Sequence, residues 1–218
     1  MSGPVSASTL LFDLDGTLID SAIGITRCAA YAFEQLGEPV PDDATLRSWI
    51  GPPLRDSFAP LLHDFARIER AVELYRERYE VAGWSEHVVY AGIAGAIESL
   101  HAAGHRLAVV TAKNEPHARK IVSHLPFGHH FDNVIGATLD GRLSHKPELI
   151  AEALERLGVP ASECCMIGDR RMDMDGAAFH RMPGVGVLWG FGSEDELRGA
   201  GTRVLAAAPA QLPSLFTR

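Results

Sequence analysis

The chain has 218 residues, of which 46% are apolar and 22% charged, so it can bury a hydrophobic core and is not a disordered tail. Its 20 Lys and Arg against 28 Asp and Glu give a net charge of −8, and no basic run occurs. Because binding to a nucleic-acid backbone needs clustered Lys and Arg, we expect no nucleic-acid partner.

The three cysteines, Cys28, Cys164 and Cys165, lack the spacing of a zinc site or a CxxC pair, so we expect them to be reduced and packed as small apolar side chains. Residues 1–9 show no signal-peptide pattern, and no apolar run approaches the roughly 20 residues that a membrane span needs. We therefore expect a cytoplasmic protein with no membrane partner. The oligomeric state stays open.

The first predicted strand, residues 9–12, is a short apolar run that leads directly into Asp13-Leu14-Asp15-Gly16-Thr17. Apolar residues at i, i+3 and i+4 then predict helices. These helices span residues 25–36, 43–50 and 68–79. Residues 21–88 are therefore predicted to form a helical cap domain inserted after the first strand.

From residue 91 onward, helices and strands alternate. Strands are predicted at residues 106–110, 133–135, 164–167, 185–188 and 203–206. Helices are predicted near residues 93–103, 116–124, 147–157 and 173–181, after Ser193, and in the tail. Such alternation predicts an α/β fold with a Rossmann-like parallel sheet and helices on both faces. Residues 1–20 and 89–218 would form this core.

Chemically active side chains follow the predicted strands. Asp13 and Asp15 follow the first strand, Thr111 ends the second, and Asp169 follows the fourth, while Lys146 precedes a helix in the same layer. In open parallel sheets, ligands bind beyond the carboxyl ends of the strands. We therefore expect one lysine, one hydroxyl and three carboxylates to converge on a single crevice.

This set of side chains suits phosphoryl transfer. Mg²⁺ prefers carboxylate oxygens and the oxygens of a substrate phosphate. A carboxylate such as Asp13 attacks phosphorus only when the repulsion between anions is neutralised, and Lys146 together with the metal would supply that charge. Asp15 would protonate the leaving alkoxide and later activate water.

Four segments resemble the motifs of the haloacid dehalogenase-like phosphatase superfamily, in its usual order. They are residues 12–18 (FDLDGTL), 110–111 (VT), 146–147 (KP) and 167–173 (IGDRRMD). The position of the cap, together with residues 51–54 and 187–190, resembles the phosphoglycolate phosphatase-like group. One departure is Ala112, which stands where Ser or Asn is commoner.

The resemblance implies a catalytic role for each matched residue. Asp13 would be the nucleophile and Asp15 the general acid and base. Thr111 would donate a hydrogen bond to the phosphoryl oxygens, and Lys146 would orient Asp13 and offset charge.

The implied cofactor is Mg²⁺. Its ligands would be Asp13, the backbone carbonyl of Asp15, Asp169 and, directly or through water, Asp173. A second interpretation of Asp173, as a cap of the following helix, stays open. Asp175 is interpreted as a solvated residue.

The resemblance implies a small phosphorylated metabolite as substrate, with phosphoglycolate first and a nucleoside 5′-monophosphate as the alternative. Arg55, expected on a cap loop, is either a clamp for a substrate carboxylate or a solvated side chain. A sugar-phosphate mutase, a dehalogenase, a regulatory protein of the same fold and a phosphotransferase acting on protein tyrosine are weaker alternatives. The histidines are interpreted as surface residues, and the cap aromatics as its core.

Overall fold

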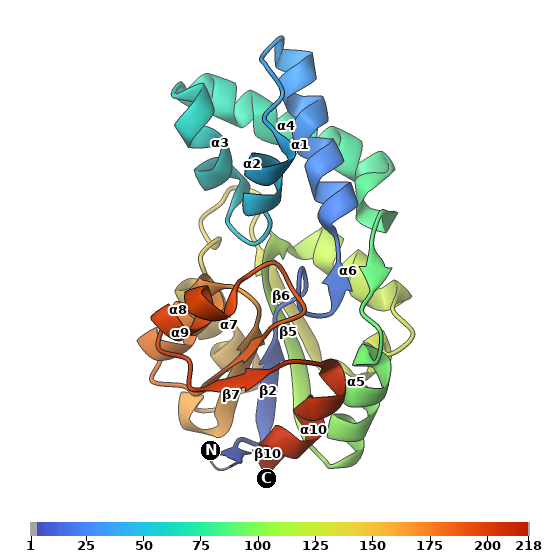
Figure 1. Cartoon of the computed structure of the whole chain (residues 1–218), viewed down its shortest axis with the longest axis vertical. Helices are drawn as coiled ribbons and strands as arrows, with labels where there is room; N and C mark the ends of the chain where they lie inside the picture. The colour runs from blue at the N-terminus through green and yellow to red at the C-terminus, as the bar shows by residue number, and fades with distance from the viewer. Residues whose placement is uncertain (1–3, 218) are drawn as a thin grey trace.

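The structure, a computed structural model, describes residues 4–217. Its centre is a six-stranded parallel sheet with the strand order β6-β5-β2-β7-β8-β9 (Figure 1). In that order the strands are β6 (Asn133–Ala137), β5 (Arg106–Asn114), β2 (Thr9–Phe12), β7 (Cys164–Gly168), β8 (Gly184–Val187) and β9 (Val204–Ala206). The predicted Rossmann-like α/β fold is therefore confirmed.

Helices cover both faces of the sheet, because its strands are apolar on both sides. Leu10 and Phe12 belong to the hydrophobic cluster on one face, and Leu11 belongs to the cluster on the other. This alternation explains why β2 is a continuous apolar run. The flanking helices are α5 (Ile93–Ala102), α6 (Glu115–His124), α7 (Lys146–Leu157), α8 (Arg171–Phe179), α9 (Glu194–Gly199) and α10 (Leu212–Leu215).

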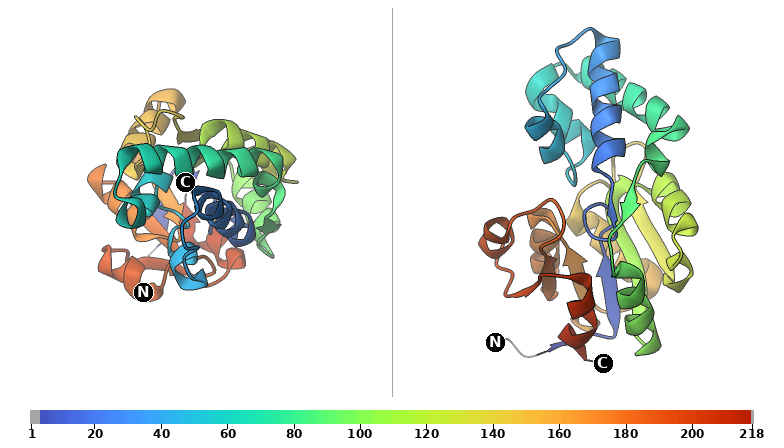
Figure 2. Two further views of the ribbon diagram at one scale, coloured as in Figure 1. Left: turned by 90° about the horizontal axis from the view of Figure 1, so that it is seen from above. Right: turned by 45° about the vertical axis from the view of Figure 1, so that its right-hand side comes forward.

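The cap lies beyond the carboxyl end of β2 (Figure 2). It contains α1 (Ala22–Leu36), α2 (Asp43–Ser48), α3 (Leu54–Leu62) and α4 (Phe65–Val81). The chain enters the cap through β3 (Ile19–Asp20) and leaves it through β4 (Val88–Val89), and these two short strands pair in antiparallel fashion. The connection between cap and core therefore consists of two adjacent chain segments.

Aromatic side chains form the interior of the cap, as predicted. Phe33, Trp49, Phe58, Tyr75 and Tyr79 form a chain of neighbouring rings whose centroids lie 5.5–6.4 Å apart. These distances are typical of favourable ring contacts. Trp49, Tyr75 and Tyr79 also line a cavity, so they belong both to the cap interior and to the wall that faces the core.

Several local predictions were wrong. Arg55 lies in the first turn of α3 rather than on a loop, because the residues after Pro53 continue as a helix. The second core strand continues to Asn114, and its register shifts after Thr111. At the C-terminus, β10 (Phe216–Thr217) pairs with β1 (Val5–Ser6), a contact between distant segments that no local pattern indicates.

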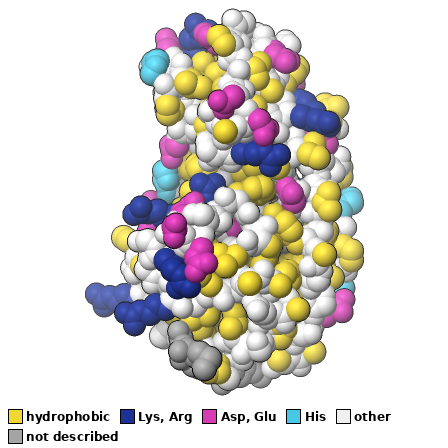
Figure 3. All heavy atoms as spheres, in the orientation of Figure 1, with side chains coloured by type: hydrophobic (Ala, Val, Ile, Leu, Met, Phe, Trp, Pro, Cys, Tyr) yellow, Lys and Arg dark blue, Asp and Glu magenta, His cyan; other side chains and the backbone are white. Residues whose placement is uncertain are grey.

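His105 also differs from the expectation for the histidines, because it is buried and its Nδ1 lies 2.9 Å from the carbonyl oxygen of Ala7. All three cysteines are buried and free, as expected. Within residues 4–217, no helix has both the length and the apolar character needed to cross a bilayer. On the face shown in Figure 3, Lys and Arg side chains are interspersed with Asp and Glu over both cap and core.

The aromatic interior should make a large contribution to the stability of the cap. Phe58 is fully buried, whereas Phe65 of the same domain is 76% exposed. We expect Phe58→Ala to lower the free energy of unfolding by about 3–5 kcal/mol, because it leaves a cavity, and Phe65→Ala to change it little. Urea denaturation followed by tryptophan fluorescence measures both. Similar losses in the two variants would contradict this account of the cap.

Candidate active site

The position of β2 places Asp13 and Asp15 at the centre of the site. Phe12, the last residue of β2, is in register with Val109 of β5 on one side and with Ile167 of β7 on the other. Residues that follow these three strands therefore meet at one edge of the sheet, where parallel sheets bind ligands. The structure brings together there Asp13, Asp15, Thr111, Lys146, Asp169 and Asp173, all of them buried.

Gly16 allows this close approach. Its φ is +84°, a conformation that glycine adopts readily, and a Cβ there would lie 2.2 Å from Oδ2 of Asp169. A larger residue would therefore strain the turn and displace the Asp169 carboxylate. The Asp-Gly pair of the first motif is thus required by space as well as by turn geometry.

Lys146, the first residue of α7, is the central cation of the site. Its Nζ lies 2.9 Å from Oδ1 of Asp13 and 2.7 Å from Oδ1 of Asp173. It also donates a hydrogen bond of 2.9 Å to the carbonyl oxygen of Val110. Burial would lower the pKa of Lys146, but Asp13 and Asp173 together hold it above its usual range. The ammonium therefore stays charged and restrains carboxylates from two separate elements.

Asp169 is held by hydrogen bonds from two other segments. Its Oδ1 accepts from the Thr17 hydroxyl at 3.2 Å, and its Oδ2 accepts from the backbone N–H of Phe191 at 2.8 Å. Phe191 belongs to the loop after β8, where Trp189 donates through Nε1 to the carbonyl oxygen of Thr17 at 3.0 Å. This explains the position of the Trp189 segment, whose role the sequence did not indicate.

Three carboxylates of the site fit a metal ion. Within residues 4–217, the only group of three or more candidate ligands whose atoms lie within 4.8 Å of one another is Asp13, Asp169 and Asp173. Burial is the main cause that raises the pKa of Asp13, to about 6, and that of Asp169 well above its usual range; neighbouring carboxylates add to both shifts. Lys146 contacts two of these three carboxylates, so the group as a whole calls for a further cation, and carboxylate oxygens are what Mg²⁺ prefers.

Asp173 fits both interpretations that the sequence left open. Its Oδ2 accepts from the backbone N–H of Arg170 at 3.0 Å, which caps the N-terminus of α8, while its Oδ1 contacts Lys146. Asp175, in contrast, points away from the site and pairs with Arg171 at 3.0 Å on the surface, as expected for a solvated residue.

Lys113 is a residue of the site that the sequence analysis missed. Its Nζ lies 2.9 Å from Oδ2 of Asp15, and both side chains are almost fully buried. The register shift of β5 after Thr111 precedes it, and its backbone N–H donates to the Thr111 hydroxyl at 3.2 Å. A lysine placed two residues after the second motif was a signal that could have identified it.

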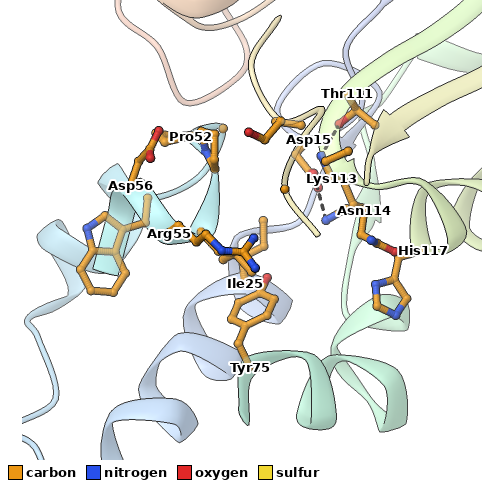
Figure 4. Close-up of a pocket in the computed structure, with 18 of the residues that line it drawn as sticks. Asp15, Ile25, Pro52, Arg55, Asp56, Tyr75, Thr111, Lys113, Asn114 and His117 are labelled. Carbon is orange, nitrogen blue, oxygen red and sulfur yellow. Dashed lines mark hydrogen bonds and ion pairs between the residues drawn. The ribbon is translucent and has the colours of Figure 1, made fainter. Parts of the chain in front are cut away.

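A cavity of about 260 Å³ lies between cap and core. Figure 4 shows Asp15, Lys113 and Asn114 on its core side, facing Arg55 and Tyr75 of the cap. The side-chain oxygen and nitrogen of Asn114 are buried and have no hydrogen-bond partner among the described residues. The volume of this cavity is near the lower end of small-molecule pockets, which start at roughly 300 Å³.

Arg55 lines this cavity, but its guanidinium is engaged. Its Nε and Nη2 lie 2.6 and 2.8 Å from the two carboxylate oxygens of Glu69, in a paired arrangement that is among the stronger side-chain contacts. The pair compensates the charge of Arg55. A substrate carboxylate would therefore have to compete with Glu69.

Residues 10–187 match the family of haloacid dehalogenase-like hydrolases. The chain is 46% identical over 190 residues to a 5′-nucleotidase of Pseudomonas aeruginosa, covering 87% of this chain and 86% of the relative. It is 38% identical over 204 residues to the tyrosine-protein kinase PtkA of Mycobacterium tuberculosis, covering 93% and 69%. It is 32% identical over 184 residues to a phosphoglycolate phosphatase of Aquifex aeolicus, covering 84% and 85%.

Among solved structures, a predicted phosphatase from Clostridium acetobutylicum superposes with a TM-score of 0.90 at 36% identity, covering 97% of each chain. The family match spans most of the sequence, and the fold agrees over nearly its whole length. The resemblance predicted from four short motifs is therefore confirmed, and the chain belongs to the haloacid dehalogenase-like hydrolases and has the fold of their phosphatases.

Proposed function

We propose that this protein is a Mg²⁺-dependent phosphatase that hydrolyses a small phosphomonoester through a phosphoaspartyl intermediate on Asp13. The observation that supports it most is the convergence of Asp13, Lys146, Asp169 and Asp173 at the end of β2, beneath a cavity of small-molecule size. Phosphoryl transfer is mainly a matter of placing an anionic nucleophile and offsetting charge, and these residues do both.

In the first step, a carboxylate oxygen of Asp13 forms a bond to phosphorus and the bond from phosphorus to the ester oxygen breaks. Asp15 gives its proton to the departing oxygen, which leaves as an alcohol. Lys146 offsets the negative charge of Asp13 and fixes its orientation. Thr111, within the neighbouring strand β5, lines the cavity and would donate through its hydroxyl to the phosphoryl oxygens.

In the second step, water attacks the phosphorus of the phosphoaspartate. Asp15, now ionised, accepts a proton from that water, the bond between phosphorus and the Asp13 oxygen breaks, and inorganic phosphate leaves. Asp13, Asp169, Asp173 and the Asp15 carbonyl would hold Mg²⁺, which would supply the additional positive charge that the anionic nucleophile and the phosphate need in order to approach each other. The cap limits the access of bulk water to the site.

The cavity favours a nucleoside 5′-monophosphate over phosphoglycolate. A phosphoglycolate site needs a cation for the second carboxylate, and of the two cap arginines that line the cavity Arg55 is engaged by Glu69 and Arg76 donates to the carbonyl oxygen of Leu139. Asn114 lines the cavity, and its buried amide has no partner among residues 4–217, so a rotation of this side chain would offer a donor and an acceptor to hydroxyls or a base edge. Trp49, Tyr75 and Tyr79 contribute aromatic groups to the same lining. The 46% identity to a 5′-nucleotidase supports the same choice.

The nucleophile can be tested by a substitution that keeps the shape of the side chain. We expect Asp13→Asn to lower phosphate release by at least about 10³-fold with the fold intact, because the amide cannot attack phosphorus. Asp175→Asn, on the exposed face of α8, is the matched control and should keep full activity. Retention of more than about a tenth of the activity by pure Asp13→Asn protein would refute the phosphoaspartate mechanism.

Metal binding should depend on pH in a defined direction. Because the pKa of Asp13 is raised to about 6, the folded protein without metal holds protons that the unfolded chain releases, and its stability falls as pH rises from about 4 to above about 6. Mg²⁺ replaces those protons, so the melting-temperature gain from Mg²⁺ over EDTA should be small near pH 5 and larger near pH 7.5. Asp169→Asn should lose most of the gain, and a gain independent of pH would contradict the assignment.

Substrate choice can be measured on a panel of phosphorylated metabolites. We expect nucleoside 5′-monophosphates to be hydrolysed with a higher kcat/KM than phosphoglycolate. Asn114→Ala should lower kcat/KM for the nucleotide by about tenfold, the equivalent of one hydrogen bond, and should affect p-nitrophenyl phosphate little. Faster turnover of phosphoglycolate would restore it as the first candidate, and transfer to a tyrosine peptide in place of phosphate release would favour the phosphotransferase alternative.

A further inference from the structure

Lys113, two residues after the second motif, has contacts that the motif does not explain. It lies in β5 next to the register shift. Its ammonium contacts Asp15, whereas the ammonium of Lys146 contacts Asp13 and Asp173. Bulges and register shifts often redirect a side chain at an active site. The site therefore contains two buried lysines, and each contacts a different catalytic carboxylate.

The contact with Lys113 leaves the two oxygens of Asp15 in different environments. Oδ2 lies 2.9 Å from the Lys113 ammonium, whereas Oδ1 is buried and has no hydrogen-bond partner among residues 4–217. Asp15 lines the cavity in which the substrate would lie (Figure 4). We propose that Lys113 is a positioning residue that holds the Asp15 carboxylate in place for proton transfer to the ester oxygen of the substrate, and that the cap fixes the position of Lys113 through Tyr79.

Tyr79 gives the cap a direct contact with this pair. It lies in α4 of the cap, and the Lys113 ammonium sits 4.7 Å from the centre of its ring, within the range of a cation–π interaction. Tyr79 is 2% exposed, so its ring is fixed by its surroundings. The general acid is thus connected to the cap by two successive contacts, from Asp15 to Lys113 and from Lys113 to Tyr79.

This proposal rests on the proposed phosphatase mechanism and concerns the proton transfer alone. An alkoxide leaving group needs the proton of Asp15 when its bond to phosphorus breaks, whereas p-nitrophenolate leaves as a stable anion without it. The hydrolysis of the phosphoaspartate needs Asp15 as base for both substrates. Loss of the correct orientation of Asp15 should therefore slow the first step only for the alkyl ester and the second step for both.

Lys113→Met, which keeps most of the side-chain volume and removes the charge, tests this. We expect its kcat/KM for the fastest alkyl phosphate of the panel to fall by about 100-fold, the usual scale of general acid catalysis, and its kcat/KM for p-nitrophenyl phosphate to stay within about threefold. Lys120→Met is the matched control, because Lys120 also pairs with a carboxylate, Glu80, and lies over a cap ring, Trp84, but outside the cavity. It should leave both values unchanged.

A rapid-mixing experiment separates the two steps. With p-nitrophenyl phosphate, Lys113→Met should release a burst of about one p-nitrophenol per site followed by a slow phase, because the phosphoenzyme forms normally and is hydrolysed slowly. In an Asp15→Asn background, adding Lys113→Met should change kcat/KM for the alkyl ester by less than about twofold, because Lys113 acts through Asp15. If circular dichroism shows that Lys113→Met is unfolded, Lys113→Gln replaces it with the same expectations.

Equal losses with both substrates, or an additive loss in the Asp15→Asn background, would overturn the proposal and indicate a direct contact of Lys113 with the phosphoryl group or a purely structural role. No loss with either substrate would overturn it as well. These outcomes are independent of the proposed function, which is decided by wild-type activity and by Asp13→Asn.

Discussion

The buried ammonium of Lys146 is the interaction on which the site depends. It connects the end of β2, the carbonyl of Val110 in β5 and the start of α8 through Asp13, Asp173 and one backbone hydrogen bond. Removing one partner of a buried ion pair typically costs about 3–5 kcal/mol, because the remaining charge is left uncompensated. The same contact that orients the nucleophile therefore also holds three elements of the core together.

The carboxylates that Lys146 and Lys113 do not neutralise determine what the pocket can bind. Asp169 contacts a hydroxyl and a backbone N–H but has no lysine of its own, and its pKa is raised by burial and by the nearby Asp173 and Asp13. A buried carboxylate in this state binds either a proton or a metal ion. The same group of carboxylates then explains the affinity for a divalent cation and the affinity for a phosphate group. The cation offsets the negative charge of the carboxylates and also that of the substrate.

Much of the core was predictable because its signals are local. The apolar run before Asp13, the Pro147 start of α7 and the Ser193 cap of α9 each depend on neighbouring residues, and the structure has all three elements. The carboxyl ends of parallel strands meet by topology, so strand assignment alone was enough to predict that Asp13, Thr111 and Asp169 come together.

The features that were missed depend on contacts between distant segments. The pairing of β1 with β10 joins the two ends of the chain, and the contact of Lys113 with Tyr79 joins core and cap. The engagement of Arg55 by Glu69 joins two cap helices and was hidden because the helix that carries Arg55 was not predicted. The division of the chain into a cap of residues 21–88 and a core stays a prediction of the sequence.

The contacts between cap and core differ in strength, and this difference indicates how the cap can open. The Glu80 carboxylate meets His117 and Lys120 at 2.6 and 3.2 Å but is 61% exposed, and exposed ion pairs contribute only about 0–1 kcal/mol each. Arg76 donates to the carbonyl oxygen of Leu139 in a similarly exposed setting. These contacts can break and re-form at little cost when a substrate enters.

The pair of Lys113 and Asp15 lies entirely within the core, so movement of the cap does not require it to separate. Opening would remove the Tyr79 ring from the ammonium and expose the pair to water, where ion pairs weaken. Closure would bring the ring back to the ammonium and exclude water from the pair. The lower dielectric constant would strengthen the interaction of Lys113 with Asp15. Access to the site and the placement of its general acid would thus be coupled by one aromatic residue of the cap.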